Sequence, residues 1–177
     1  MVSEVTVNYM LVFCRVTTAL VFLYSASGKG LDIHSFEHAV ANFQLLPPKL
    51  HRLAAWCFLA GEILVIWLVA RGGQFLVWGF GLAALLLLVF SAALASVLVR
   101  KITAACNCFG ASEKPVTGYD LWRNGGFVAC ALLGLGASTN GAAQANLQLA
   151  EVGLVGLVAA VFVVMWVNLG EIAQIFR

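Results

Sequence analysis

Residues 75–99 read FLVWGFGLAALLLLVFSAALASVLV, a run that contains no charged residue. A bilayer core of about 30 Å is crossed by roughly 20 apolar residues in an α-helix, so this run predicts a transmembrane span. The composition agrees, because 62% of the 177 residues are hydrophobic and only 10% are charged. A water-soluble domain needs a larger charged surface than that. The chain is therefore predicted to be an integral membrane protein.

Similar apolar runs lie on both sides of this segment. Arg71-Gly72-Gly73 is a short connection to the preceding run, so those two spans are expected to pack antiparallel. The fourth span is the least apolar, and its glycines suit close packing of helices in lipid. The predicted spans are about 9–27, 53–70, 75–99, 121–137 and 152–169, and the glycines of the fourth are Gly125, Gly126, Gly134 and Gly136.

The first two spans are separated by a predicted hydrophilic turn at 28–32 and then by residues 35–46. The second stretch has apolar side chains at helical spacing and stops at Pro47-Pro48, which is typical of an amphipathic helix at the membrane interface. The segments outside the spans are too short for a soluble core. The predicted fold is all-α, a single domain over 1–177 with four to five transmembrane helices and this interfacial helix.

The N-terminus lacks the basic region and small-residue cleavage site of a signal peptide, so the first span is predicted to be retained. The formal net charge of +2 suggests no nucleic-acid partner. We expect a multi-pass protein of the cell (inner) membrane, with the lipid bilayer as its surroundings. A transporter is disfavoured, because neither repeated halves nor paired broken helices are visible.

Basic residues are distributed unevenly between the two predicted sides of the membrane. By the positive-inside rule this places the loop between the third and fourth spans in the cytoplasm. That inference assumes that the basic residues direct insertion rather than belong to a functional site. One side carries Lys29, Lys49, Arg52, Arg100, Lys101, Lys114, Arg123 and Arg177, and the other carries Arg71.

Two of the five cysteines, Cys106 and Cys108, fall outside the spans. A disulfide between cysteines one residue apart closes a small, strained ring, and strain makes it easier to reduce. The pair is therefore suited to exchanging electrons with another dithiol, and nearby basic residues would lower a thiol pKa. Two incidental thiols, a static bridge and soft-metal binding remain alternatives. Cys14, Cys57 and Cys130 lie inside apolar runs, where cysteine packs as a small apolar residue.

Charged residues inside the spans form the second candidate group. Arg15 lies in the first span and Glu62 in the second, and a charge at mid-bilayer is costly and usually paired. Either they form a buried ion pair that fixes helix register, or they form a proton or quinone site coupled to the thiols. Lys29 and Asp32, in the loop after the first span, allow either a structural or a functional interpretation.

His34 and His38 are four residues apart on one face of the interfacial helix, and His51 follows the prolines. Histidines on adjacent turns can bind a metal ion. On the polar face of such a helix, however, solvated side chains are the commoner case. We therefore predict no metal site and retain His34 and His38 only as an alternative.

The order of these motifs resembles the MauE branch of the DoxX-like membrane proteins. The resemblance covers roughly residues 9–135. It rests on Arg15 in the first span, Ser25-Ala-Ser-Gly-Lys29, Asp32, Phe36, Leu45-Leu-Pro47, Gly61-Glu62, the loop Cys106-Asn-Cys108-Phe109-Gly110 and Arg123-Asn124.

This resemblance implies a membrane thiol-redox protein of four or five helices. Cys106 and Cys108 would be the redox pair, and the supporting polar set would be Arg15, Lys29, Glu62 and Arg123. The methylamine-utilisation member is associated with maturation of a disulfide-rich periplasmic dehydrogenase subunit, alongside a thioredoxin-like partner. An exported partner favours the outer face for the cysteine loop, against the charge distribution. No cofactor is firmly implied, and a quinone is left open as electron acceptor.

The sequence is consistent with three functions. The leading one is a thiol–disulfide oxidoreductase that exchanges electrons with a thioredoxin-like or exported protein. The second is a non-catalytic assembly or anchoring subunit of a larger membrane complex. The third is a metal-handling protein that uses the loop cysteines and the histidines.

Overall fold

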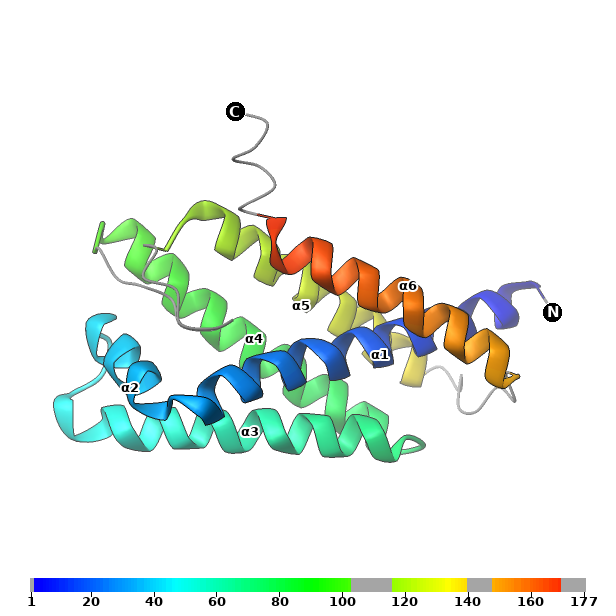
Figure 1. Ribbon diagram of the computed structural model, residues 1–177, viewed down its shortest axis with the longest axis horizontal. Coiled ribbons are helices and arrows are strands. Elements are labelled where there is room, and N and C mark those ends of the chain that lie inside the picture. Colours follow the sequence, from blue (N-terminus) through cyan, green and yellow to red (C-terminus); the bar gives the residue numbers. More distant parts are fainter. Residues whose placement is uncertain (1, 103–115, 140–147, 170–177) are drawn as a thin grey trace.

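The computed structural model describes residues 2–102, 116–139 and 148–169 (Figure 1). These residues form helices, with no strand among them. The elements are α1 (Val2–Leu31), α2 (Ile33–Asn42), the 3₁₀ turn η1 (Pro48–Leu50), α3 (His51–Arg71), α4 (Phe75–Val99), α5 (Gly118–Thr139) and α6 (Leu149–Val167).

Four segments are long and apolar enough to cross a membrane, namely Val5–Leu31, Pro48–Arg71, Phe75–Val99 and Ala150–Val167. This confirms the predicted fold class, an integral membrane helical bundle. The surroundings of these helices are therefore a lipid bilayer. The fifth long helix, α5, is less apolar and packs along α1 and α4. At 1.5 Å per residue it is about 33 Å long, comparable to the bilayer core.

The predicted turn at residues 28–32 is wrong over most of its length, because α1 continues through Leu31. A helical turn brings Ser25 and Lys29, four residues apart, onto one face. Lys29 is buried there, and its interactions outweigh the weak helix propensity of the neighbouring glycines. The break comes at Asp32, whose side chain accepts a hydrogen bond from the backbone N–H of Ser35 and caps α2.

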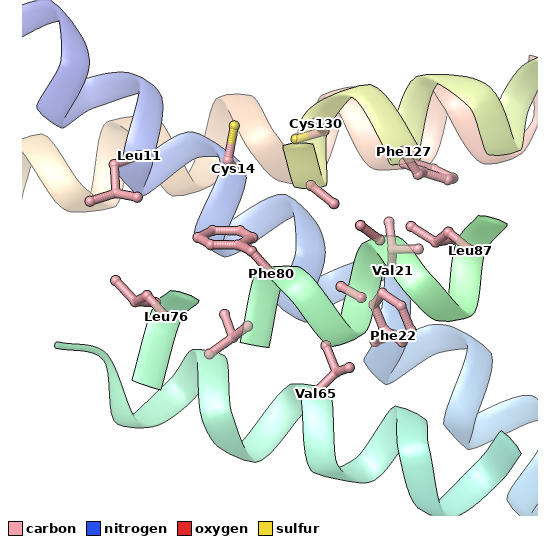
Figure 2. Packing of buried hydrophobic residues seen from close by; sticks show 14 of the residues in the cluster. Leu11, Cys14, Val21, Phe22, Val65, Leu76, Phe80, Leu87, Phe127 and Cys130 are labelled. Carbon is pink, nitrogen blue, oxygen red and sulfur yellow. The ribbon is translucent and has the colours of Figure 1, made fainter. Parts of the chain in front are cut away.

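The core lies where α1, α3, α4 and α5 meet (Figure 2). Phe80 of α4 is fully buried at its centre. A Cβ added at Gly134 of α5 would lie 2.5 Å from the Phe80 ring, and one added at Gly126 would lie 2.5 Å from Trp166 of α6. Two of the four glycines of the predicted fourth span therefore stand at close helix contacts. Nothing described lies within 4 Å of such a Cβ at Gly125 or Gly136.

The cysteines inside the helices occupy different surroundings. Cys14 of α1 and Cys130 of α5 are buried in the core (Figure 2), and their thiols interact with each other. Both fit the prediction of a small apolar packing residue. Cys57 of α3 is exposed instead, on the outer surface of the bundle.

The end of the bundle that carries α2 is held together by a second, smaller apolar cluster. Phe43 packs there with Leu94 and Val97 of α4, and Ile102 and Val116 pack against them. Arg100, just after α4, donates a hydrogen bond to the backbone oxygen of Gln44 at 3.3 Å. We call this end of the molecule the α2 end. It contains the end of α1 and of α4 and the start of α3 and of α5.

Candidate functional site

A buried ion pair links α1 to α3 at the α2 end. Lys29, in the last turn of α1, donates through Nζ to Oε1 of Glu62, in the middle of α3. The two residues are only 3% and 4% exposed. Ser25 joins them, because its hydroxyl accepts from Lys29 Nζ at 3.0 Å and donates to Glu62 Oε1 at 3.0 Å. Three polar side chains thus form one closed hydrogen-bonded group inside an apolar bundle.

Three phenylalanines surround the ammonium group of Lys29. Its Nζ lies 4.7 Å from the ring centroid of Phe36 and 6.0 Å from those of Phe58 and Phe90. The rings come from α2, α3 and α4, so each of these helices contributes one to the group. A cation over the face of an aromatic ring is attracted by the electrons of the ring. These contacts offset part of the free energy lost when the ammonium group leaves water.

The second carboxylate oxygen of Glu62 is buried and has no hydrogen-bond partner in the described part of the chain. A small cavity of about 30 Å³ is lined by Glu62 together with Ser25 of α1, Phe90 of α4 and Asn124 of α5. The Asn124 amide donates to the Leu87 backbone oxygen at 3.2 Å and to the Ser91 hydroxyl at 2.9 Å. A buried acceptor without a partner is costly, so Glu62 Oε2 is available to a proton or to a donor.

A larger cavity of about 360 Å³ lies between α2, α3 and α4 and is lined by the same phenylalanines. Phe36, Phe58 and Phe90 belong to its wall, so the rings that surround Lys29 also face this space. The lining is apolar apart from the Ser96 hydroxyl. The described residues that line it are Phe36, Val40, Phe43, Leu45, Leu46, Ala54, Phe58, Val89, Phe90, Ala92, Ala93 and Ser96.

Residues 7–137 match the protein family described as Methylamine utilisation protein MauE. The chain belongs to the MauE family. The matched region contains the ion pair, the walls of both cavities, and Cys106 and Cys108, whereas α6 lies beyond it. No curated protein and no solved structure matches the chain.

Arg15 lies away from the ion pair of this MauE family protein. Its guanidinium donates to the backbone oxygens of Val69 at 2.9 Å and Ala70 at 2.8 Å, at the end of α3. The predicted pairing of Arg15 with Glu62 is therefore wrong, and the partner is Lys29. Arg15 precedes Lys29 by about four helical turns, roughly 21 Å along the axis. It therefore reaches the opposite end of α3 and satisfies carbonyl groups that the helix leaves unpaired.

Arg123, also part of the predicted polar set, holds α5 against α6. Its guanidinium lies 3.2 Å from the Asp120 carboxylate and donates to the Val167 backbone oxygen at 3.3 Å. The Trp166 indole in turn donates to the Arg123 backbone oxygen at 2.9 Å. The structure therefore joins Lys29 to Glu62, and it places Arg15 and Arg123 at other helix contacts.

The histidines do not come together around a common point. His34 is exposed and lies 3.5 Å from Glu37, and the His51 ring contacts the Leu46 backbone oxygen at 2.9 Å. His38 is exposed on α2. Within residues 2–102, 116–139 and 148–169, no group of three or more His, Cys, Asp or Glu is arranged to hold a metal ion.

Cys106 and Cys108 lie outside the described residues. The described chain stops at Ile102 and resumes at Val116, and both residues pack in the apolar cluster of the α2 end. Cys106 is four residues after Ile102 in the sequence.

Several residues of the site were not found from the sequence. Ser25 appeared only as part of a family motif, although its spacing of four residues from Lys29 places both on one helical face. Phe58 and Phe90 lie in apolar runs where nothing distinguishes them from packing residues. Their role follows from the way α3 and α4 face α1, which is a tertiary property.

Proposed function

We propose that this MauE family protein is a thiol–disulfide redox protein of the inner membrane. Cys106 and Cys108 are the exchanging pair, and the partner is a thioredoxin-like or exported protein. A partner thiolate attacks one sulfur of the Cys106–Cys108 disulfide and forms a mixed disulfide. The second partner thiolate then attacks its own sulfur in that bond. The partner leaves oxidised, and the loop pair keeps two electrons and two protons as two thiols.

The observation that carries this proposal is the buried Lys29–Glu62 pair with its unpartnered carboxylate oxygen. It lies at the α2 end, where the chain leaves and re-enters the described structure. Charged residues within a membrane bundle are expensive and mark functional sites by default. Dithiol chemistry transfers protons together with electrons, and a carboxylate with a free acceptor oxygen is a suitable proton acceptor.

The four charged residues of the predicted polar set take two different roles in this proposal. Lys29 and Glu62 are the proton-exchanging pair. Arg15 and Arg123 are positioning residues, because their hydrogen bonds to backbone oxygens fix the end of α3 and the α5–α6 contact. In this proposal neither arginine takes part in electron transfer.

A Cys108→Ser variant tests the proposal through the reverse exchange. In that direction Cys106 attacks the disulfide of an oxidised partner and Cys108 releases the partner from the mixed disulfide, and the variant lacks this second sulfur. We expect Cys106 to accumulate a mixed disulfide in cells, visible on non-reducing gels and identifiable by mass spectrometry. In the unaltered protein, alkylation should show two thiols appearing together on reduction. The matched control is Cys57→Ser, which changes an exposed cysteine of α3 and should trap nothing.

Full alkylation of Cys106 and Cys108 under oxidising conditions, with no trapped partner, would contradict the proposal. If the Cys106→Ser/Cys108→Ser double variant also supports normal growth on the relevant substrate, the chain is instead an assembly or anchoring subunit. The outer faces of the helices would then be the surface to test.

A further inference from the structure

We propose that the cavity between α2, α3 and α4 binds a membrane quinone, which accepts the electrons of the loop thiols. This inference rests on the proposed thiol chemistry, and it names the oxidant that such chemistry requires. In the balanced step two thiols and one quinone give one disulfide and one quinol. The sulfurs lose two electrons and two protons, and the two quinone oxygens gain them.

The cavity has the size and lining that such a ligand needs. Small-molecule pockets in proteins commonly enclose about 300–1,000 Å³ and are mostly apolar, and this one measures about 360 Å³. Four phenylalanines contribute to its wall, Phe36, Phe43, Phe58 and Phe90. Aromatic rings pack well against a flat conjugated ring, in offset or edge-to-face arrangements. The half-open side leaves room for an apolar tail to extend into lipid.

The Lys29–Glu62 pair next to this wall favours a quinone over a lipid tail as the occupant of the cavity. Phe36, Phe58 and Phe90 contact both the cavity and Lys29 Nζ. A quinone oxygen becomes more negative as electrons arrive, and a nearby ammonium group in an apolar medium stabilises that charge strongly. An acyl chain gains nothing from Lys29. Among the described residues of the lining there is also no charged group that would hold a phospholipid headgroup.

Glu62 gives the pocket a proton supply. Its Oε2 is buried without a described partner, and Glu62 is one of the residues that line the smaller cavity of about 30 Å³. A water molecule needs roughly 10–15 Å³ of such space and two to four polar partners, and Ser25, Glu62 and Asn124 line this one. Glu62 and a water held there would deliver protons to the reduced quinone once a phenylalanine ring rotates aside.

Cavity-filling substitutions on α3 test the binding of the quinone directly. Ala54 lines the cavity, whereas Ala60, on the same helix, is exposed on the outer surface. Purified protein in phosphatidylcholine nanodiscs would be titrated with decyl-ubiquinone, and the bound quinone would be extracted and quantified. We expect about one quinone per chain, binding at least tenfold weaker in Ala54→Phe, and no change in Ala60→Phe. Ala93→Phe fills the same cavity from α4 and guards against a folding defect in one variant.

The same titration separates this inference from the proposed function. A Cys106→Ser/Cys108→Ser variant should bind decyl-ubiquinone normally but fail to form quinol from a reduced dithiol partner. Saturable quinone binding with neither partner exchange at the cysteines nor thiol-dependent quinol formation would contradict the proposed function and leave the quinone site standing. Partner exchange at the cysteines with no saturable quinone binding, or with equal binding in Ala54→Phe and Ala60→Phe, overturns the quinone site alone.

Discussion

Glu62 shows how much a single buried charge depends on its neighbours. Its carboxylate lies in the middle of α3, is 4% exposed, and receives donors from both Lys29 and Ser25 of α1. The sequence predicted that a charge at this position needs a partner, because an apolar run with one carboxylate is unstable in lipid. It did not identify the partner. The identity of the partner depends on how far α1 and α3 are shifted along each other, and a local sequence pattern does not show this shift.

Lys29→Met is expected to destabilise the protein strongly, because it leaves Glu62 buried without its counter-ion. Removing one partner of a buried pair costs about 3–5 kcal/mol. Thermal and denaturant unfolding in detergent would measure the loss. The control is Lys49→Met, at an exposed position of η1. A Lys29→Met/Glu62→Leu double variant should recover most of the stability, because no uncompensated charge remains. Equal stability of the Lys29→Met variant and the unaltered protein would show that the pair is not coupled.

Gly134→Ala is expected to lower stability, because its Cβ would lie 2.5 Å from the ring of Phe80. Phe80 is fully buried, so the ring has no free space into which to move. Overpacking of this kind costs roughly 1–3 kcal/mol. The matched control on the same helix is Gly136→Ala, where nothing described lies within 4 Å and the higher helix propensity of alanine should leave stability unchanged or slightly raised. Coinciding melting curves for Gly134→Ala and Gly136→Ala would contradict this account of the α4–α5 contact.

At the scale of elements, the sequence predicted those helices whose signal is local. The long apolar runs gave α3 and α4 because length and composition within one segment determine whether it crosses a membrane. The continuation of α1 through Leu31 was missed for a different reason. Glycines at 28 and 30 and a lysine between them indicate a turn locally, and only the burial of Lys29 against α3 makes the helical conformation favourable. Tertiary contacts therefore decided the boundary that positions the site.

The start of α2 should respond to acid through Asp32, which lies between α1 and α2. Hydrogen bonds from Ser35 hold the pKa of the Asp32 carboxyl below its ordinary value. A depressed pKa in the folded state means that the ionised form stabilises α2. This contribution is present above the usual aspartate pKa of about 4 and is lost as pH falls through the lower folded value. Thermal melts of the protein and of Asp32→Asn should differ at pH 7 and converge once the pH falls below the lowered pKa of the Asp32 carboxyl. A difference independent of pH would contradict this role of the charge.

At the scale of the whole molecule, the side of the membrane that faces the α2 end determines which partners reach the cysteine loop. Lys29 and Arg123, counted as loop charges from the sequence, lie in α1 and α5 and pair with Glu62 and Asp120. The α2 end still carries Lys49 of η1, Arg52 in the first turn of α3, and Arg100 and Lys101 after α4. Opposite them stands Arg71, the last residue of α3. The reduced charge difference still favours the cytoplasm for the α2 end.

Redox chemistry gives the opposite expectation, and we consider it the stronger argument for this protein. A strained disulfide is easily reduced, and the cytosol keeps thiols reduced, whereas disulfides persist in the periplasm. If Cys106 and Cys108 exchange electrons as proposed, the α2 end therefore faces outward. After mild reduction, a membrane-impermeant maleimide should label both cysteines in intact cells, and Cys106→Ser/Cys108→Ser should remove that signal. Labelling that appears only after the membrane is opened would place the loop inside, and a cytosolic partner would then be required.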